Sequence, residues 1–208
     1  MIEIIEPSAE IIKTENGIDI LKRLESYGRT CYKSEENITE NSARAFIISI
    51  IKRGHLSVIE HEKVSVRVIC DRGVTHEIVR HRIGSYSQES TRYVNYKKRG
   101  IQFIRPFFFN NEQYKVWLDA VDYATEVYDA LIEAGAKAEE ARSVLPNSLK
   151  TEIIVTYNLR EWRHFFELRC APSAHPQMRQ ITIPLLNCMS DYIPVIFDDL
   201  KEKFCKGN

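Results

Sequence analysis

The chain has 208 residues, 44% of them hydrophobic and 28% charged, which is enough to predict a single domain spanning residues 1–208 around a substantial core. Its 29 Lys and Arg residues balance 29 Asp and Glu residues, so the formal net charge is zero. Because domains that bind nucleic acid usually carry a basic excess, we expect no nucleic acid as a partner.

The cysteines and the N-terminal segment indicate in which cellular compartment the protein is expected. Five scattered cysteines include no Cys-x-x-Cys pair, which argues against a disulfide framework or a cysteine zinc site. The N-terminal segment carries acidic residues early, and no apolar run reaches the length of a membrane span. We therefore expect a cytoplasmic protein with no membrane partner.

The first half of the chain predicts helices separated by short strands. Val64 to Cys70 alternate apolar and polar side chains, as in a half-buried strand, and Asp71 or Thr75 can cap a helix that ends near Gly84. In chain order we expect a strand at 2–5, helices at 12–27 and 41–53, a polar turn at 54–61, a strand at 64–70, a helix at 71–82 and a loop at 85–91.

The second half predicts mainly helix. Asn110 or Asn111 can cap one helix and Asn158 another, and Pro184 and Pro194 are expected to bend the last helix. In order we expect a ragged strand or hairpin at 93–104, a helix from 110 to about 134, a second segment at 137–145, a strand at 153–157, a helix at 159–169 and a helix from 176. The mixture predicts an α+β fold, with helices packed on a small, mostly antiparallel sheet.

The segment from Arg80 to Tyr93 concentrates hydrogen-bond donors among small side chains. Arg80, His81 and Arg82 are consecutive, and Ser90 and Arg92 follow. Guanidinium groups stay charged and suit phosphate or the polar edge of a base. This composition predicts a pocket for an anionic small molecule with many hydrogen-bonding groups.

A second cluster runs from Asn158 to Arg169. On a helix, Arg160 and His164 share one face, whereas Arg163 is expected to point elsewhere. A solvated amphipathic helix would explain the same residues, because charge runs usually lie on the surface. Arg142, which precedes an apolar turn, has a similar plain alternative as a surface residue.

Metal and nucleophile chemistry find little support. His55 and His61 lie in one turn, but no set of acidic residues stands at a known ligand spacing, so we expect no metal. Ser90 lacks the Gly-x-Ser-x-Gly elbow of a serine nucleophile. There is also no Gly-x-Gly-x-x-Gly or P-loop sequence, which argues against an ordinary Rossmann site.

Taken together, these residues resemble the flavin-dependent thymidylate synthases. That family's signature is Arg-His-Arg, any seven residues, then Ser, and here Arg80–Arg82 is followed at that spacing by Ser90 and then by Thr91-Arg92-Tyr93. The resemblance extends over about residues 55–170 and includes the His55 turn, Arg142 to Pro146, and the cluster from Asn158 to Arg169.

The resemblance implies a reaction and its partners. The family methylates dUMP to dTMP, taking a methylene from methylenetetrahydrofolate and electrons from NADPH through bound FAD, with no covalent nucleophile supplied by the enzyme. It also implies a mixed α/β subunit in a homotetramer whose active sites are shared between subunits. The chain would therefore be an FAD-dependent, NADPH-oxidising methyltransferase.

The resemblance also assigns roles by position. Arg169 would be catalytic, assisting ionisation at N3 of the uracil. The expected FAD contacts are His55, Ser57, Arg80, His81, Arg82, Gln88, Asn158, Leu159, Arg160 and His164. The expected dUMP contacts are Glu77, Arg80, Gln88, Glu89, Ser90, Thr91, Arg92, Arg142 and Arg169. Other members of the family carry different residues at the positions of Gln88, Glu77 and His164, which affects individual hydrogen bonds.

Two other functions compete with this one. A non-enzymatic nucleotide- or RNA-binding module would use the arginines as a phosphate patch and bind in a strongly salt-dependent way. A metal-dependent hydrolase would use His55, His61 and His81 and lose activity with a chelator.

Overall fold

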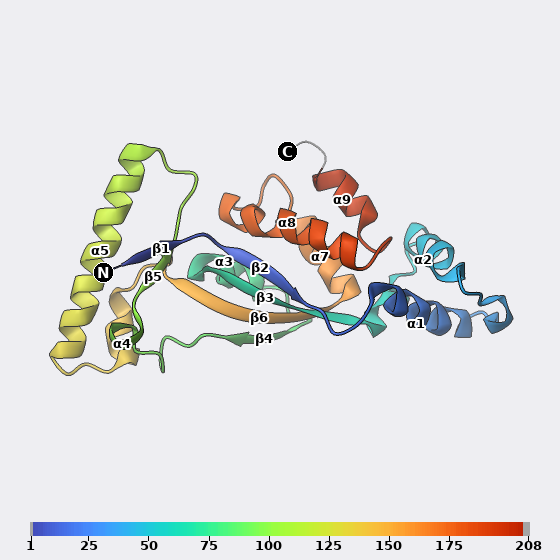
Figure 1. Cartoon of the computed structure of the whole chain (residues 1–208), viewed down its shortest axis with the longest axis horizontal. Coiled ribbons are helices and arrows are strands. Elements are labelled where there is room, and N and C mark those ends of the chain that lie inside the picture. The colour runs from blue at the N-terminus through green and yellow to red at the C-terminus, as the bar shows by residue number, and fades with distance from the viewer. Residues whose placement is uncertain (1, 206–208) are drawn as a thin grey trace. The chain divides into compact units, whose positions relative to one another are not determined.

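The computed structural model describes residues 2–205. Within them, unit 1 comprises residues 2–8, 68–80 and 86–154, and unit 2 comprises residues 9–67, 81–85 and 155–205. Helices dominate, and the strands form a small four-stranded sheet and a separate pair (Figure 1), which confirms the predicted α+β class.

The main sheet has four strands in the order β2 (Ser8–Ile12), β3 (Lys63–Asp71), β6 (Lys150–Asn158) and β4 (Ser85–Gln88). The central strands β3 and β6 each contribute residues to both units. On β3, the side chains from Val64 to Cys70 are buried at every second position, as the alternation predicts, and β6 behaves in the same way from Thr151 to Tyr157. Both strands therefore present one apolar face.

Unit 1 holds a parallel pair of strands, β1 (Glu3–Ile5) and β5 (Gln102–Ile104), in which Ile4 is opposite Phe103. Its core gathers around Phe103, Tyr128 and Leu149, which are fully buried. The helices of this unit are α3 (Arg72–Ile78), α4 (Tyr96–Arg99), α5 (Asn111–Glu133), α6 (Ala138–Ala141) and the 3-10 turn η3 (Arg142–Val144).

Helix α5 begins where the sequence predicts. The Asn110 side chain accepts a hydrogen bond from the Gln113 backbone N–H, and the Gln113 side chain accepts one from the Asn110 backbone N–H. This reciprocal capping satisfies two helix-end donors that would otherwise lack partners.

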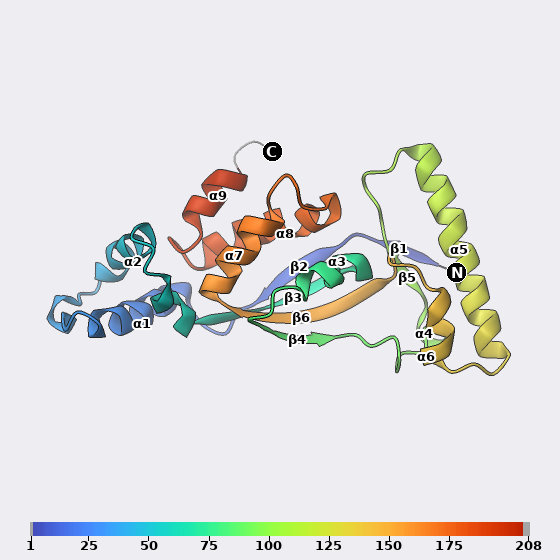
Figure 2. The same cartoon turned by 180° about the vertical axis from the view of Figure 1, so that it is seen from behind.

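Unit 2 is mostly helical. It contains α1 (Gly17–Thr30), η1 (Glu35–Asn37), α2 (Ser42–Lys52), η2 (Leu56–His61), α7 (Leu159–Arg169), α8 (Pro176–Tyr192) and α9 (Asp198–Phe204). Helices α1 and α2 lie side by side (Figures 1 and 2), and Leu24 and Ile47 are fully buried in them. Helix α7 also packs against α8 and α9.

Helix α7 is anchored to β3 at its N-terminal end. The indole N–H of Trp162 donates to the Val64 carbonyl oxygen at 3.0 Å. The backbone N–H of Leu159 donates to the Glu62 carbonyl oxygen at 2.9 Å. Trp162 and Phe166 stack with ring centroids 5.6 Å apart, so the helix is fixed by hydrogen bonds as well as by aromatic packing.

Gly84 lies directly against the buried ring of Tyr157. A Cβ atom at residue 84 would stand 2.3 Å from two carbon atoms of this ring. Real Cβ atoms do not approach other atoms so closely, so the absence of a side chain at this position lets the segment after His81 run against β6.

Several predicted boundaries are wrong. Ile12 belongs to β2 and not to a helix, because α1 begins at Gly17 after the capping side chain of Asn16. Helix α3 ends at Ile78 instead of near Gly84. The segment from Ser85 is a strand and not a loop, paired through its backbone: just after it, the Glu89 N–H donates to the Glu152 carbonyl oxygen at 2.8 Å.

Two further expectations for the second half need correction. The segment at 93–104 contains the short helix α4 before β5 and is not a hairpin. Pro184 lies inside α8, but Pro194 follows the end of that helix at Tyr192 and does not bend it. The helix predicted at 159–169 is confirmed, with Asn158 capping it by accepting from the Glu161 N–H at 2.8 Å.

Among residues 2–205, no helix combines the length and apolar character needed to cross a membrane.

Candidate active site

His81 connects the two predicted clusters through hydrogen bonds. Its ring is 4% exposed and lies against one face of α7. Its Nδ1 is 2.8 Å from Glu161 Oε1, and its Nε2 accepts a hydrogen bond from Arg169 Nε at 3.2 Å. The middle residue of Arg80-His81-Arg82 therefore joins the first turn of α7 to its last turn.

The protonation of His81 follows from these partners. Arg169 Nε always carries a hydrogen, so Nε2 of His81 must be the unprotonated acceptor. The ring proton then sits on Nδ1 and points to the carboxylate of Glu161. Burial lowers the pKa of His81, and the nearby Arg169 guanidinium also lowers it, although the hydrogen bond to Glu161 acts in the opposite direction. A neutral imidazole with a fixed tautomer is the result.

One group of possible metal ligands exists among the described residues, formed by His81, Glu161 and His164. Their ligand atoms lie within 4.8 Å of one another. Both ring nitrogens of His81 are already engaged in hydrogen bonds, so we interpret the group as a hydrogen-bond network. The group includes neither His55 nor His61, the histidines that the hydrolase hypothesis requires in addition to His81.

A cavity of about 580 Å³ runs along α7 in unit 2. It brings together Arg160 and His164, which the helical spacing placed on one face. Arg160 Nη1 pairs with Glu60 Oε1 at 2.5 Å, and both side chains are about half exposed. Arg163 makes two hydrogen bonds with Asp199 at 2.6 and 2.7 Å, but it also lines this cavity and so does not point wholly away from Arg160 and His164 as expected. The cavity is lined by Leu56, Glu60, Ile83, Asn158, Arg160, Glu161, Arg163, His164 and Glu167.

The other expected flavin contacts of unit 2 differ in exposure. His55 precedes η2, and its Nδ1 is 3.1 Å from the Tyr32 hydroxyl. Ser57 and Arg82 are exposed, whereas the Leu159 side chain is fully buried in the core. Their roles toward a cofactor remain predictions.

In unit 1, Gln88 is fixed by two threonines. Its Nε2 donates to Thr75 Oγ1 at 3.0 Å and to Thr151 Oγ1 at 3.2 Å. The Thr75 hydroxyl in turn donates to the Arg72 carbonyl oxygen at 2.9 Å. The amide group of Gln88 is thus held in one orientation by α3 and β6.

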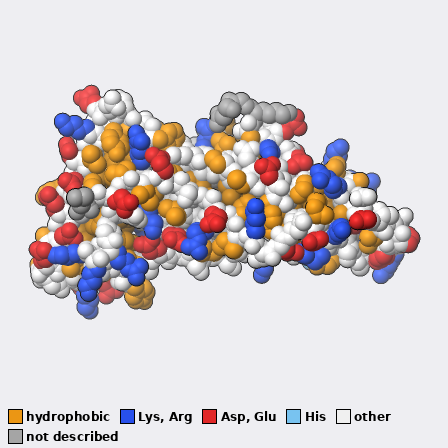
Figure 3. All heavy atoms as spheres, in the orientation of Figure 1, with side chains coloured by type: hydrophobic (Ala, Val, Ile, Leu, Met, Phe, Trp, Pro, Cys, Tyr) orange, Lys and Arg blue, Asp and Glu red, His pale blue; other side chains and the backbone are white. Residues whose placement is uncertain are grey.

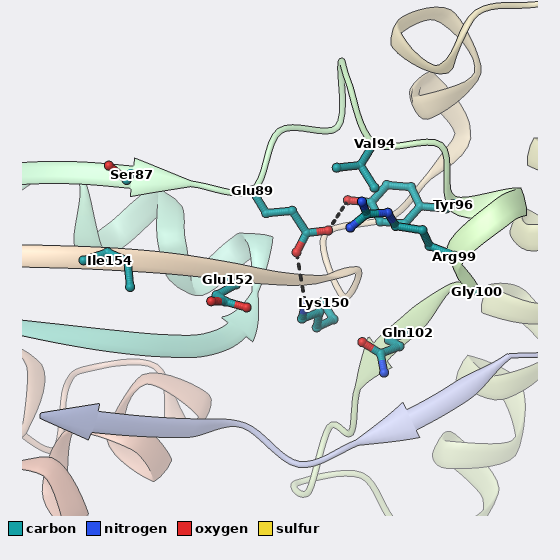
Figure 4. A pocket seen from close by; sticks show the side chains of 10 residues that line it. All are labelled: Ser87, Glu89, Val94, Tyr96, Arg99, Gly100, Gln102, Lys150, Glu152 and Ile154. Atoms are coloured by element: carbon teal, nitrogen blue, oxygen red, sulfur yellow. Dashed lines mark hydrogen bonds and ion pairs between the residues drawn. The ribbon is translucent and has the colours of Figure 1, made fainter. Parts of the chain in front are cut away.

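Glu89 occupies the centre of a polar cavity of about 430 Å³ (Figure 4). One carboxylate oxygen accepts from Lys150 Nζ at 2.9 Å and the other accepts from the Tyr96 hydroxyl at 3.0 Å. Burial raises the pKa of Tyr96, and the Glu89 carboxylate raises it further, so the phenol stays protonated. Sequence reasoning missed both partners of Glu89. Lys150 is 61 positions away in the sequence, and Tyr96 lies in the segment that was expected to be a ragged strand or hairpin.

The expected dUMP contacts Ser90, Thr91, Arg92 and Arg142 lie together in unit 1. Arg142 Nη1 donates to Thr91 Oγ1 at 3.0 Å, and Arg92 Nε is 3.6 Å from Glu139 Oε2 of α6. Ser90 Oγ accepts from the Arg92 backbone N–H at 3.3 Å. Arg142 and Arg92 are both exposed, so their guanidinium groups can meet a ligand from solvent.

Glu77 and Arg80 do not lie on one continuous helix, although a helix was predicted at 71–82. Glu77 is in the last turn of α3, and the Arg80 backbone N–H donates to the Glu77 carbonyl oxygen at 3.2 Å, beyond the helix end. The chain therefore brings the predicted site residues together in two groups. One group, in unit 1, contains Gln88 to Arg92 with Arg142, and the other, in unit 2, contains His81 with α7.

Acidic and basic side chains are interspersed on the face drawn in Figure 3. Arg23, Arg29, Arg160 and Arg163 of unit 2 are each paired with a carboxylate. This pattern resembles an ordinary solvated surface more than the single-sign surface of a nucleic-acid-binding module.

The fold and these residues define a class of protein. Residues 16–195 match the family described as thymidylate synthase complementing protein, and the chain belongs to this family.

Its relatives carry more particular names. The chain is 37% identical over 180 residues to the flavin-dependent thymidylate synthase of Geobacter sulfurreducens, covering 82% of this chain and 78% of that protein. The protein of the same name from Pyrococcus furiosus is 35% identical over 178 residues, covering 82% and 73% of the two chains. A UMP/dUMP methylase, PolB from Streptomyces cacaoi, bound with 5-Br dUMP, shares the fold with a TM-score of 0.79 over 97% of each chain at 22% identity.

Proposed function

We propose that this protein is a flavin-dependent thymidylate synthase that methylates dUMP to dTMP with methylenetetrahydrofolate and NADPH. Family membership supports the reaction class. One observation supports the proposal at the level of single residues. Arg169 Nε donates a hydrogen bond to His81 Nε2, which joins the signature sequence to the second cluster.

Arg169 has the chemistry that the reaction needs. Carbon 5 of uracil is a poor nucleophile until electron density is pushed into the ring. A guanidinium beside the developing negative charge stabilises that state most when it is already oriented before reaction. Arg169 is partly buried and directed by His81, so it is held in place before a substrate arrives.

The nucleotide phosphate is assigned to the group in unit 1. Arg92 and Arg142 bring positive charge to the segment after β4, and Ser90 and Thr91 add hydroxyl groups. The ion pair between Arg92 and Glu139 is exposed and worth little, at most about 1 kcal/mol. A dianionic phosphate can therefore replace it at small cost.

The residues along α7 fit a flavin dinucleotide in their donor set. The cavity presents Arg160 and His164 beside apolar Leu56 and Ile83, a combination suited to a charged diphosphate and a flat ring system. The ion pair between Arg160 and Glu60 is exposed, so a diphosphate can displace Glu60 from the guanidinium. Bound FAD would supply the hydride chemistry, and these side chains would bind and orient it.

The remaining expectations belong to the same proposal. Both units together would act as one catalytic domain, in a homotetramer whose sites are shared between subunits. The five cysteines, all of them within the described residues, are free, which is consistent with a cytoplasmic enzyme in a reducing compartment.

Purified protein tests the proposal. We expect a yellow protein whose flavin absorbance bleaches with NADPH, and dTMP formation only when dUMP and methylenetetrahydrofolate are both present. Parallel assays with UMP and with a chelator separate this activity from that of a UMP methylase and from metal-dependent hydrolysis. Protein that cannot be reconstituted with FAD, or that forms no dTMP when loaded, would contradict the proposal.

A further inference from the structure

Glu161 is a buried carboxylate for which the predicted site has no role. It is 8% exposed and stands in the first turn of α7, where its charge is favoured by the helix dipole. Its backbone N–H is bound by the Asn158 side chain at 2.8 Å, which fixes the start of the helix around it. The carboxylate is therefore oriented toward His81, with Oε1 2.8 Å from Nδ1.

The contact between Glu161 and Nδ1 determines whether Nε2, on the opposite side of the His81 ring, can accept a hydrogen bond. With the Nδ1 hydrogen donated to the carboxylate, Nε2 keeps its lone pair and accepts from Arg169 Nε. In the other tautomer, or in the doubly protonated ring, two N–H groups would face each other across that 3.2 Å contact. Glu161 thus selects the single form of His81 that can hold Arg169.

Packing restricts the ring to this position. His164 and Phe165 of α7 meet it edge-on, with ring centroids 5.5 and 5.0 Å away, and Tyr157 of β6 lies 6.0 Å away. These neighbours pack around the ring, but a change of tautomer moves no heavy atom. Two contacts distinguish the ring nitrogens: the Glu161 carboxylate favours a hydrogen on Nδ1, and Arg169 Nε–H favours a lone pair on Nε2.

We propose that Glu161 is a positioning residue, which orients His81 and, through His81, the guanidinium of Arg169. The effect on turnover rests on the proposed function, in which Arg169 contacts the pyrimidine. The effect on the His81 tautomer does not depend on that function.

The variant Glu161→Gln preserves size and removes the charge. Its amide can either accept from Nδ1 or donate to it, so only Arg169 still favours the Nδ1–H form and the preference for it is weakened. In holoenzyme labelled with ¹⁵N-histidine, we expect the wild type to show His81 protonated at Nδ1 only, with the signal assigned by its absence in His81→Gln. In Glu161→Gln we expect this pattern to be lost and kcat for dTMP formation to fall about 10- to 100-fold, the factor for one hydrogen bond made by a charged group. KM for dUMP should change less than kcat.

Glu25→Gln is the matched control. Glu25 is 1% exposed in the same unit and accepts from Arg29 Nη2 and Ser42 Oγ, both at 2.8 Å. The control therefore removes a buried, paired charge away from His81, and we expect it to keep both the tautomer and kcat. Glu161→Asp retains the charge with a shorter reach, and should keep the Nδ1–H form with a smaller loss of kcat.

The outcomes separate the two proposals. An unchanged His81 pattern or an unchanged kcat in Glu161→Gln would overturn the positioning role, as would an equal loss in Glu25→Gln. If Glu161→Gln does not fold, Glu161→Asp decides, because a severe loss of kcat with the Nδ1–H form intact would mean that Glu161 does not act through His81. Wild-type protein that forms no dTMP would count against the proposed function, while the tautomer spectra would still test the orientation of His81.

Discussion

Arg142 and Thr91 are joined by a hydrogen bond of 3.0 Å between Nη1 and Oγ1. The bond ties η3 to the segment that carries Ser90 and Arg92, although the two segments are separated by 51 positions in the sequence. Both guanidinium groups of the proposed phosphate site are thus placed by contacts within unit 1, before any ligand is bound.

Replacing Arg92 with Ala should weaken dUMP binding by about 1.5–3 kcal/mol, the contribution of a hydrogen bond to a charged group. Isothermal titration of the flavin-loaded enzyme measures this change. Arg105→Ala is a matched control, because Arg105 pairs with Glu6 at the same 3.6 Å and its side chain is 57% exposed, against 56% for Arg92. Equal dUMP affinities in the wild type and Arg92→Ala would remove Arg92 from the phosphate site.

Replacing Arg169 with Ala should lower kcat by a factor of about 100 or more, the effect of losing a preorganised donor at developing charge. Arg169→Lys should also be impaired, because a single ammonium group cannot bind His81 and the pyrimidine in the geometry of a planar fork. Single-turnover dTMP formation at saturating dUMP measures the effect, with flavin content as the control. Turnover at the wild-type rate in Arg169→Ala would show that another residue polarises the uracil.

Changing Gln88 to Glu should destabilise the fold by about 1–3 kcal/mol, because two donated hydrogen bonds are replaced by an acceptor. The Thr151 hydroxyl can turn to donate, but that of Thr75 already donates to Arg72. Urea unfolding at pH 7 measures the loss, which should shrink as the pH falls and the new carboxyl group becomes protonated. Gln113→Glu is the control, since Gln113 acts there as an acceptor. Equal losses in both variants would contradict this explanation.

The stability of the protein should fall as the medium is acidified through the range of His81. Burial lowers the pKa of His81, so between the ordinary value of about 6.5 and the lower folded value the unfolded chain binds more protons than the native one. The contribution of the neutral ring is fully present above pH ~6.5 and is lost as the pH falls through the folded pKa. Urea unfolding from pH 7.5 to 5 should therefore show a shallower slope in His81→Gln. Parallel slopes would assign the acid sensitivity to other groups.

The sequence predicted best those features that depend on neighbouring residues. The 159–169 helix and its Asn158 cap are correct, and Asn110, one of the two predicted candidates, caps α5, because periodicity and capping are local. Helix α3 was predicted too long, since Val79 continues the apolar spacing but is 40% exposed in the structure. Strand β4 was missed because its side chains are polar and its pairing is made by backbone atoms.

The candidate site shows the same division. The signature from Arg80 to Ser90 was visible in the sequence, but the partners that define its chemistry were not. Glu161 is 80 positions from His81 and Lys150 is 61 positions from Glu89. No spacing rule relates such pairs, and the three-dimensional structure is needed to bring them together.

The tight contact between Gly84 and Tyr157 links the signature segment to a residue far along the chain. Because even a methyl group at position 84 would overlap the aromatic ring, we expect a larger residue there to be tolerated only together with a smaller one at position 157. The two sites should therefore vary as a pair among functional versions of this protein, and a library randomised at both should recover activity in matched combinations only.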